Sequence, residues 1–415
     1  MTRYLLPLAL AGGLLAVPAL AFDPEAATRA YLATLAGAAR ARSDAYFEGG
    51  YWLILWQALV TTGVALAFLH FGWAARLSAW AGRVARGRRW LAAMLWVAAF
   101  FAALALLTLP YEAWADFVRE HSYGLSTQSF AAWLGDWAKG SAIGLVLITV
   151  LSAILLPLVR RLPRTWWLWS AAVTMVLVAV ATAVAPVYIL PLFNKYHAMP
   201  ASPLQTRLLA MANANGVGVK DIMVVDESRR SKRVSANVSG LGSTLRVTLN
   251  DNLLAKNDPA MTRAITGHEL GHYVLSHTGW RVAGFSVVIL LGYLAVHLLV
   301  PGLLRRYGAR WGVTALDDPA MVAPAVVILT LYILLATPVN NTIIRTQELQ
   351  ADAFGLDVAR APDGFARAAM TLSSYRKLEP GTVEEMLFYD HPSGRTRVSK
   401  AMAWKAAHLG EAGVE

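Results

Sequence analysis

The chain alternates between long apolar stretches and shorter polar ones. A helix needs about 20 residues to cross a bilayer, and seven stretches of roughly that length or more lack Asp, Glu, Lys and Arg: residues 4–22, 49–75, 90–111, 140–159, 165–194, 282–304 and 319–344. We therefore expect a mainly α-helical, polytopic membrane protein with about seven spans. Aromatic residues such as Tyr51, Trp90 and Trp166 stand near the ends of several stretches, where amphipathic rings prefer to lie.

The first apolar stretch permits two interpretations. Arg3, the run that follows it and the small residues Ala19 and Ala21 are typical of a signal peptide with its cleavage site. The same stretch is also long enough to stay in the membrane as a first span. Residues 1–22 are therefore expected to be one or the other.

The polar segment after the fifth span mixes helix and strand signals. Residues 202–215 predict a helix that stops at Gly216, and residues 221–225 and 234–250 predict strands, the latter broken by glycines. We expect an inserted α+β domain over 195–281, ending in a helix over about 259–276. Membrane helices and loops precede it over 23–194. Two spans over 282–344 and a helical C-terminal part over 345–415 follow it.

Composition agrees with a membrane protein and narrows its chemistry. The chain is 57% hydrophobic and 15% charged, whereas soluble domains are nearer a quarter charged. It has no cysteine, which excludes disulfides, thiolate metal sites and a cysteine nucleophile. The net charge of +11 comes from arginines at the ends of spans and one short basic loop at 229–233. We therefore expect membrane lipid, and no nucleic acid, as a partner.

The basic residues also predict an orientation. Arginines crowd three short connections, at 76–89, 160–164 and 305–310, and all three fall on one side if seven segments alternate. The positive-inside rule makes that side cytoplasmic. The inserted domain is then extracytoplasmic. The alanine- and arginine-rich composition suggests a bacterial inner membrane.

The pentapeptide His-Glu-Leu-Gly-His at 268–272 carries the clearest chemistry. On a helix, His268 and His272 are four residues apart and point from one face, so both rings can bind one zinc ion. Glu269 lies beside them as a general base for a water molecule. An exposed amphipathic helix with two unrelated histidines is the alternative, which the apolar stripe around the motif makes the weaker one.

An open catalytic zinc site needs a third protein ligand. Glu348 and Asp352 are four apart on a predicted helix, and an out-and-back pair of spans can return them to the first helix. Glu348 would bind the metal, and Asp352 would accept a hydrogen bond from a zinc-bound histidine. From spacing alone, a polar helix face just outside the membrane is an equally good interpretation.

The segment His-Pro-Ser-Gly-Arg-Thr-Arg supplies His391 and Arg397. Near a metal, such a pair can stabilise the oxyanion of a tetrahedral intermediate. By itself the segment is more typical of a surface turn followed by a basic helix.

Taken in order, HELGH, ELQAD and HPSGRTR resemble the integral-membrane CAAX prenyl endopeptidases, a family of zinc metalloproteases. Residues 235–254 and 117–140 also resemble segments of that family, and the likeness extends from about residue 49 onward. It implies seven helices around a large chamber and a gluzincin-like protease domain at one end. It implies one zinc ion on His268, His272 and Glu348.

The same resemblance implies roles for the remaining candidates. Glu269 would be the base, Asp352 the hydrogen-bond partner of a ligand, and His391 and Arg397 the groups that act on the substrate carbonyl. Asn237 would belong to the edge strand that binds the peptide. Eukaryotic members place the catalytic domain in the cytosol, whereas the charge pattern here points outward.

The expected function is that of a membrane zinc metalloendopeptidase acting on lipidated or membrane-associated peptides and proteins. The first alternative is a related quality-control protease for damaged membrane proteins, which would have the same site and a different substrate. A non-catalytic zinc-binding scaffold or transporter is the alternative of another class. Glu269 argues against it, because a structural zinc site needs no base.

Overall fold

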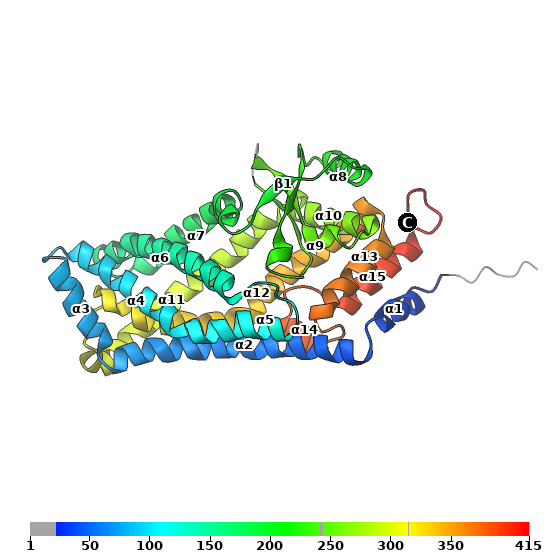
Figure 1. The fold of residues 1–415 in the computed structure, drawn as a ribbon. Helices are drawn as coiled ribbons and strands as arrows, with labels where there is room; N and C mark the ends of the chain where they lie inside the picture. The colour runs from blue at the N-terminus through cyan, green and yellow to red at the C-terminus, as the bar shows by residue number, and fades with distance from the viewer. Residues whose placement is uncertain (1–21, 241–243, 314, 415) are drawn as a thin grey trace, which may run out of the picture.

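A computed structural model describes residues 22–240, 244–313 and 315–414. Its first half is almost entirely helical (Figure 1). Two segments of π-helix, Ala113–Val118 and Ala185–Ile189, continue α4 and α7 at the ends of their apolar runs. The α-helices up to the inserted domain are α1 (Pro24–Ala33), α2 (Gly37–His70), α3 (Trp73–Val84), α4 (Arg89–Glu112), α5 (Arg119–Ser122), α6 (Phe130–Arg161) and α7 (Trp166–Val184).

The second half holds a small sheet and the remaining helices. The strands are β1 (Tyr196–Ala198), β2 (Ile222–Val225), β3 (Ala236–Ser239) and β4 (Arg246–Asn250). The helices are α8 (Pro203–Ala214), α9 (Asp251–Leu254), α10 (Pro259–Val274), α11 (His277–Trp311), α12 (Val322–Ala359), α13 (Pro362–Leu372), α14 (Thr382–Phe388) and α15 (Gly394–Ala407). The expected mainly α-helical polytopic protein with an inserted α+β domain is confirmed.

Six helical segments within the described residues are long and apolar enough to cross a membrane. Each overlaps one of the six later apolar stretches, whereas the stretch at 4–22 lies almost wholly outside the described residues. Large apolar side chains on these helices stay exposed, for example Leu335 at 79% and Leu298 at 65%. Such surface is stable against lipid but not against water. The protein is therefore a multi-pass membrane protein.

The inserted domain is built on a four-stranded sheet of order β1-β2-β4-β3. β2 and β4 are parallel, and the two outer pairs are antiparallel. A buried apolar cluster, including Leu208, Ile222 and Leu249, joins the sheet to α8 and α10. β3 is consequently an edge strand that packs beside α10.

Local sequence signals set the ends of the helix that carries the pentapeptide. Asp258 caps α10, accepting a hydrogen bond from the Met261 backbone N–H at 2.9 Å, and Pro259 occupies the first turn. At the other end Ser276 takes a left-handed backbone conformation with φ of 55°. This residue breaks the chain into two helices, so α11 starts at His277 with a new direction.

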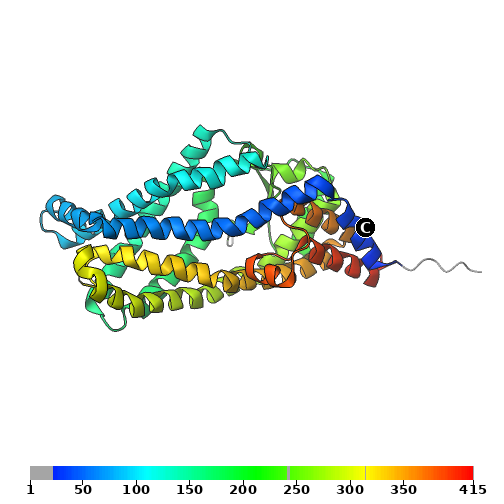
Figure 2. The same cartoon turned by 90° about the horizontal axis from the view of Figure 1, so that it is seen from below.

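One helix, α12, brings the chain back from the far end of the membrane helices to the end where α10 lies. The sequence predicted a span over 319–344 and a separate helix from 345, but the structure has a single helix from Val322 to Ala359. Its apolar half lies among the membrane helices, and its polar half reaches α10 (Figure 2). A change from apolar to polar residues does not end a helix unless a helix-breaking residue or a cap accompanies it.

A polar network joins the inserted domain to the membrane helices. Arg233 donates hydrogen bonds of 2.6 Å to Glu120 in α5 and to the hydroxyl of Tyr46 in α2, and that hydroxyl donates to Glu120 at 2.6 Å. Arg233 directly precedes Val234, Ser235 and Ala236, which line a cavity beside α10. The network therefore positions one wall of that cavity relative to the spans.

The single large chamber implied by the resemblance stays a prediction. The described helices line separate hollows between neighbouring spans, including one of about 490 Å³ between α2, α4 and α12 and one of about 520 Å³ between α4 and α6.

Candidate metal centre and active site

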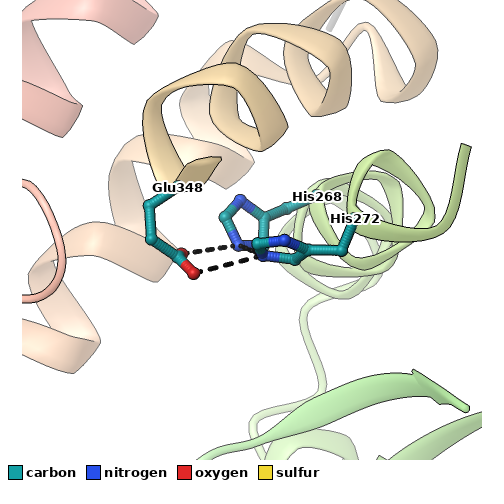
Figure 3. Close-up of side chains that lie close together, drawn as sticks. All are labelled: His268, His272 and Glu348. Atoms are coloured by element: carbon teal, nitrogen blue, oxygen red, sulfur yellow. Dashed lines mark hydrogen bonds and ion pairs between the residues drawn. The ribbon is translucent and has the colours of Figure 1, made fainter. Parts of the chain in front are cut away.

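Two histidines from α10 and one glutamate from α12 converge on a single point (Figure 3). The Nε2 atoms of His268 and His272 lie 3.1 Å apart. The carboxylate of Glu348 lies 3.1 Å from His268 Nε2 and 3.3 Å from His272 Nε2. The structure therefore brings together the three residues that the sequence indicated as metal ligands.

Small residues let the two helices approach closely enough for this contact. A methyl group added at Gly267 would lie 3.0 Å from the carbonyl oxygen of Gly355, and one added at Gly355 would lie 2.7 Å from the backbone nitrogen of His268. Gly271 likewise faces Ala351 at 3.1 Å. Since a glutamate side chain is short, this close packing is what puts Glu348 within reach of both imidazoles.

Asp352 fixes the tautomer of His268. Its carboxylate is fully buried and lies 2.8 Å from His268 Nδ1. A carboxylate oxygen can only accept, so Nδ1 carries a proton, and in the neutral ring Nε2 keeps the lone pair that a metal ion requires. Arg397 donates to the same carboxylate from Nε at 3.0 Å and from Nη2 at 2.5 Å, which compensates its buried charge.

A third histidine plays the equivalent part for His272. His277 Nδ1 lies 2.9 Å from His272 Nδ1, and His277 Nε2 lies 3.0 Å from the side-chain oxygen of Gln350. Because that oxygen accepts the Nε2 proton, His277 Nδ1 is an acceptor and His272 Nδ1 must donate to it. The Nε2 lone pair of His272 is then left pointing at the same spot as that of His268.

The site requires positive charge at its centre. Burial alone would lower the pKa of His268, but the carboxylates of Asp352 and Glu348 outweigh burial and raise it to about 10. Oε2 of Glu348 is buried and accepts no hydrogen bond from any described residue, although it lies close to His268. Two lone pairs and a carboxylate facing one another fit a divalent cation.

Glu269 lies beside this centre and has no partner among the described residues. Its side chain lines a cavity of about 170 Å³ together with His268, and it makes no hydrogen bond or ion pair with another described residue. Burial raises the pKa of Glu269 to about 7. A free carboxylate whose pKa lies near neutrality is suited to accept a proton and then return it.

His391 and Arg397 line the same cavity from the C-terminal part of the chain. His391 Nε2 lies 3.4 Å from Glu348 Oε2, while its Nδ1 lies 2.8 Å from the carboxylate of Asp390. Arg397 is buried, being 7% exposed, and is held by Asp352. The structure therefore places both residues at the site that the motif order indicated.

Asn237 lies on the edge strand but not on the cavity wall. It sits in β3 opposite Thr248 of β4, is exposed, and accepts a hydrogen bond from Ser239 at 3.1 Å. The cavity is instead lined by the residues just before it, Val234 to Ala236. Its assignment to substrate binding stays a prediction.

Sequence reasoning missed two residues of this site. His277 follows His272 by five positions, which on one continuous helix would place it on a different face. Only the break at Ser276 turns it toward His272. Arg376 lines the cavity from the turn before α14, and no motif marks it.

The comparisons with known proteins agree with this geometry. A model described as the CAAX prenyl protease N-terminal domain, with five membrane helices, matches residues 33–195. A model of peptidase family M48 matches residues 199–405. The chain belongs to peptidase family M48. The M48 match contains the inserted domain from residue 199 onward, both helices of the metal centre and the segment with His391 and Arg397.

Curated relatives and a solved structure extend this family assignment. The uncharacterised metalloprotease YhfN of Bacillus subtilis is 25% identical over 71% of this chain and 70% of its own length. A CAAX prenyl protease 1 homologue of Arabidopsis thaliana is 27% identical over 61% of this chain. The chain spans about 60% of the length of the Arabidopsis and the Schizosaccharomyces pombe relatives.

The crystal structure of S. mikatae Ste24p has the same fold, with a TM-score of 0.65 at 20% identity. The likeness covers 81% of this chain and 82% of that one. Family membership and fold together make the protein a membrane metallopeptidase of the M48 family.

Proposed function

We propose that the protein is a zinc endopeptidase that hydrolyses peptide bonds of lipidated or membrane-associated peptides and proteins. The observation that carries the proposal is the convergence of two histidine lone pairs and the Glu348 carboxylate beside the unpartnered carboxylate of Glu269. Imidazole and carboxylate ligands suit zinc, and a chain without cysteine has no thiolate to offer it.

Three protein ligands leave the metal open to water and substrate, as in catalytic zinc sites. When bound, zinc lowers the pKa of water and polarises a carbonyl group. Around it, Asp352 and His277 hold the two imidazoles in the tautomers that ligation requires. These two contacts are expected to raise metal affinity without touching the substrate.

Glu269 performs the proton transfers. It takes a proton from the attacking water and delivers it to the leaving amine, so that it ends the cycle as it began. In its imidazolium form His391 donates from Nδ1 to Asp390, and its Nε2–H can then donate to the negative charge that develops on the carbonyl oxygen. Arg397, which also lines the cavity and is paired with Asp352, adds positive charge near that oxygen.

The proposed substrate is an extended peptide that reaches the cavity along β3. An edge strand offers unpaired backbone groups, which bind a peptide with little regard to its side chains. The helix that carries Glu348, α12, is continuous with a candidate span, which favours substrates that arrive with the membrane. The curated relatives named as CAAX prenyl proteases support a lipidated substrate.

The test compares the wild-type protein with Glu269→Gln after zinc loading. We expect both to bind zinc equally, and the variant to lose about a hundredfold or more of peptide hydrolysis, the usual contribution of a general base. Glu25→Gln, an exposed change in α1, is the matched control and should keep full activity. Undiminished hydrolysis by Glu269→Gln, or by wild-type protein stripped of metal, would contradict the proposal.

We also propose that the inserted domain faces away from the cytoplasm of a bacterial inner membrane. The basic connections at 76–89, 160–164 and 305–310 support this orientation. Because the chain has no cysteine, a single introduced one reports its own side of the membrane. A membrane-impermeant maleimide on intact spheroplasts is expected to label Lys220→Cys in the inserted domain but not Arg86→Cys. The reverse labelling pattern would overturn this orientation.

A further inference from the structure

The short helix α14 turns its charged residues toward the protein. Glu384 accepts a hydrogen bond of 2.8 Å from the hydroxyl of Tyr51 in α2 and forms an ion pair of 3.0 Å with Lys377. Glu385 accepts a hydrogen bond of 2.9 Å from the backbone N–H of Ser393. Both carboxylates of the helix therefore have partners on its inner side.

The outer face of α14 is apolar. Val383 and Met386 are three residues apart, so they share one face of the helix. The two residues are 64% and 51% exposed. A helix that faces water has the opposite arrangement, with its charged residues outside and its apolar residues inside. The medium around this face is therefore expected to be apolar.

This apolar face continues the lipid-facing surface of two spans. α14 lies against α2 and α12 (Figure 1), where the ring of Phe388 stacks on that of Tyr51 with centroids 4.1 Å apart. Leu387 and Phe388 line a mostly apolar hollow of about 350 Å³ together with span residues that include Trp52 and Leu334. Trp52 is itself 63% exposed, and an exposed tryptophan near the end of a span is typical of the membrane interface.

Side chains of α12 satisfy backbone groups at the C-terminal end of α14. Asn341 donates to the carbonyl oxygen of Leu387 at 2.8 Å, and Arg345 donates to that of Glu385 at 2.8 Å and to that of Tyr389. The last carbonyl groups of a helix lack partners within the helix, and apolar surroundings make such unpaired groups costly. These donors lie where α12 changes from apolar to polar residues. The end of α14 can therefore lie at the level of the membrane interface.

We propose that α14 is an interfacial helix whose outer face, Val383 and Met386, is inserted into the lipid leaflet nearest the inserted domain. The partner is the bilayer itself, which contacts this helix in addition to the six candidate spans. The contact goes beyond the proposed peptidase function and does not depend on it. The depth of α14 in the lipid also fixes the depth of His391, which follows shortly after the helix.

Lipid accounts for this face better than a second protein surface does. A stable protein–protein interface buries about 800 Å² on each partner. Two outward side chains on a helix of seven residues offer only a small part of that area. A bilayer needs no such area, because it already surrounds the spans against which α14 lies.

The experiment measures the surroundings of this face in a bilayer. The sequence has no cysteine, so Val383→Cys and Met386→Cys each carry a single nitroxide label on the zinc-loaded full chain, in nanodiscs of phosphatidylethanolamine and phosphatidylglycerol. Relaxation of the label by oxygen, which is enriched in hydrocarbon, is compared with relaxation by a polar nickel complex, which stays in water. We expect the oxygen-to-nickel ratio at both positions to be about tenfold higher than at Lys220→Cys in the inserted domain, because a polar complex enters an apolar medium only at high cost.

Lys220→Cys is the water reference, and Leu335→Cys, at an exposed position of the span in α12, is the lipid reference. Zinc content equal to that of the wild type establishes that each variant is folded. A ratio at Val383→Cys or Met386→Cys equal to that at Lys220→Cys would place the face in water and overturn the proposal. Low accessibility to both reagents at either position would show that protein covers the face, and would overturn it as well.

Discussion

At the scale of single residues, burial gives ordinary side chains their chemical roles. Glutamate is usually exposed, and burial in the inserted domain is what raises the pKa of Glu269 to about 7, a value that suits its proposed role as a base. The pentapeptide predicted Glu269, His268 and His272 from sequence, since their spacing alone puts them on one helix face. His277 and Arg376 were out of reach, because their placement depends on the break at Ser276 and on the turn before α14.

The pH dependence of activity should report Glu269. Burial raises its pKa from the ordinary 4.5 to about 7, and a bound cation, which favours the carboxylate, pulls it back down. Since only the deprotonated form accepts a proton, kcat/KM should rise with pH through a half-maximal point between these two values. Zinc occupancy is measured at each pH as the control. A profile that stays flat down to pH 4 with zinc bound would contradict this role.

Asp352→Asn tests the hydrogen bond that holds His268. The change keeps the shape of the side chain but removes the charge that orients the ring and compensates Arg397. We expect zinc affinity, measured by competition with a chelator, to fall about ten- to a hundredfold, as for other partners of metal ligands. Asp357→Asn, on the exposed side of the same helix, should bind zinc normally. Unchanged affinity in Asp352→Asn would show that this contact does not support the site.

At the scale of elements, the metal centre depends on how closely α10 and α12 pack. The glycines at 267, 271 and 355 form the contact between the two helices, and their sequence positions do not predict it. Pairing of helices distant in sequence leaves no local signal: Gly267 and Gly355 are separated by two complete spans. The helix ends were more accessible to prediction, because caps such as Asp258 and stops such as Gly216 are local features.

Gly355→Ala should damage the site through packing alone. The added methyl group would lie 2.7 Å from the His268 backbone nitrogen, so the two helices must separate. We expect a destabilisation of about 1–3 kcal/mol, as for other overpacked contacts, together with loss of zinc affinity. Gly135→Ala in α6, where the methyl group meets no atom within 4 Å, is the control and should be neutral or slightly stabilising. Thermal unfolding and chelator competition measure both effects, and equal behaviour of the two variants would refute the packing argument.

At the scale of the whole molecule, the membrane topology serves to bring two polar helix ends together. The alternation of apolar and polar stretches predicted the six described spans, because lipid demands long uncharged segments. It did not predict that α12 continues unbroken from the membrane into the metal centre. The residues become polar from 345 onward, but the helix does not end there. That continuity makes the last span a rigid support for Glu348.

The central claim is that one zinc ion is held jointly by α10 and α12. Diffraction at the zinc absorption edge, on crystals of the zinc-loaded protein, tests it most directly by locating the metal. The account predicts one anomalous peak within about 2.0–2.2 Å of His268 Nε2, His272 Nε2 and a carboxylate oxygen of Glu348, and no such peak in crystals of Glu348→Ala. A zinc peak elsewhere in the chain, or one that touches the histidines while Glu348 lies out of bonding distance, would contradict it.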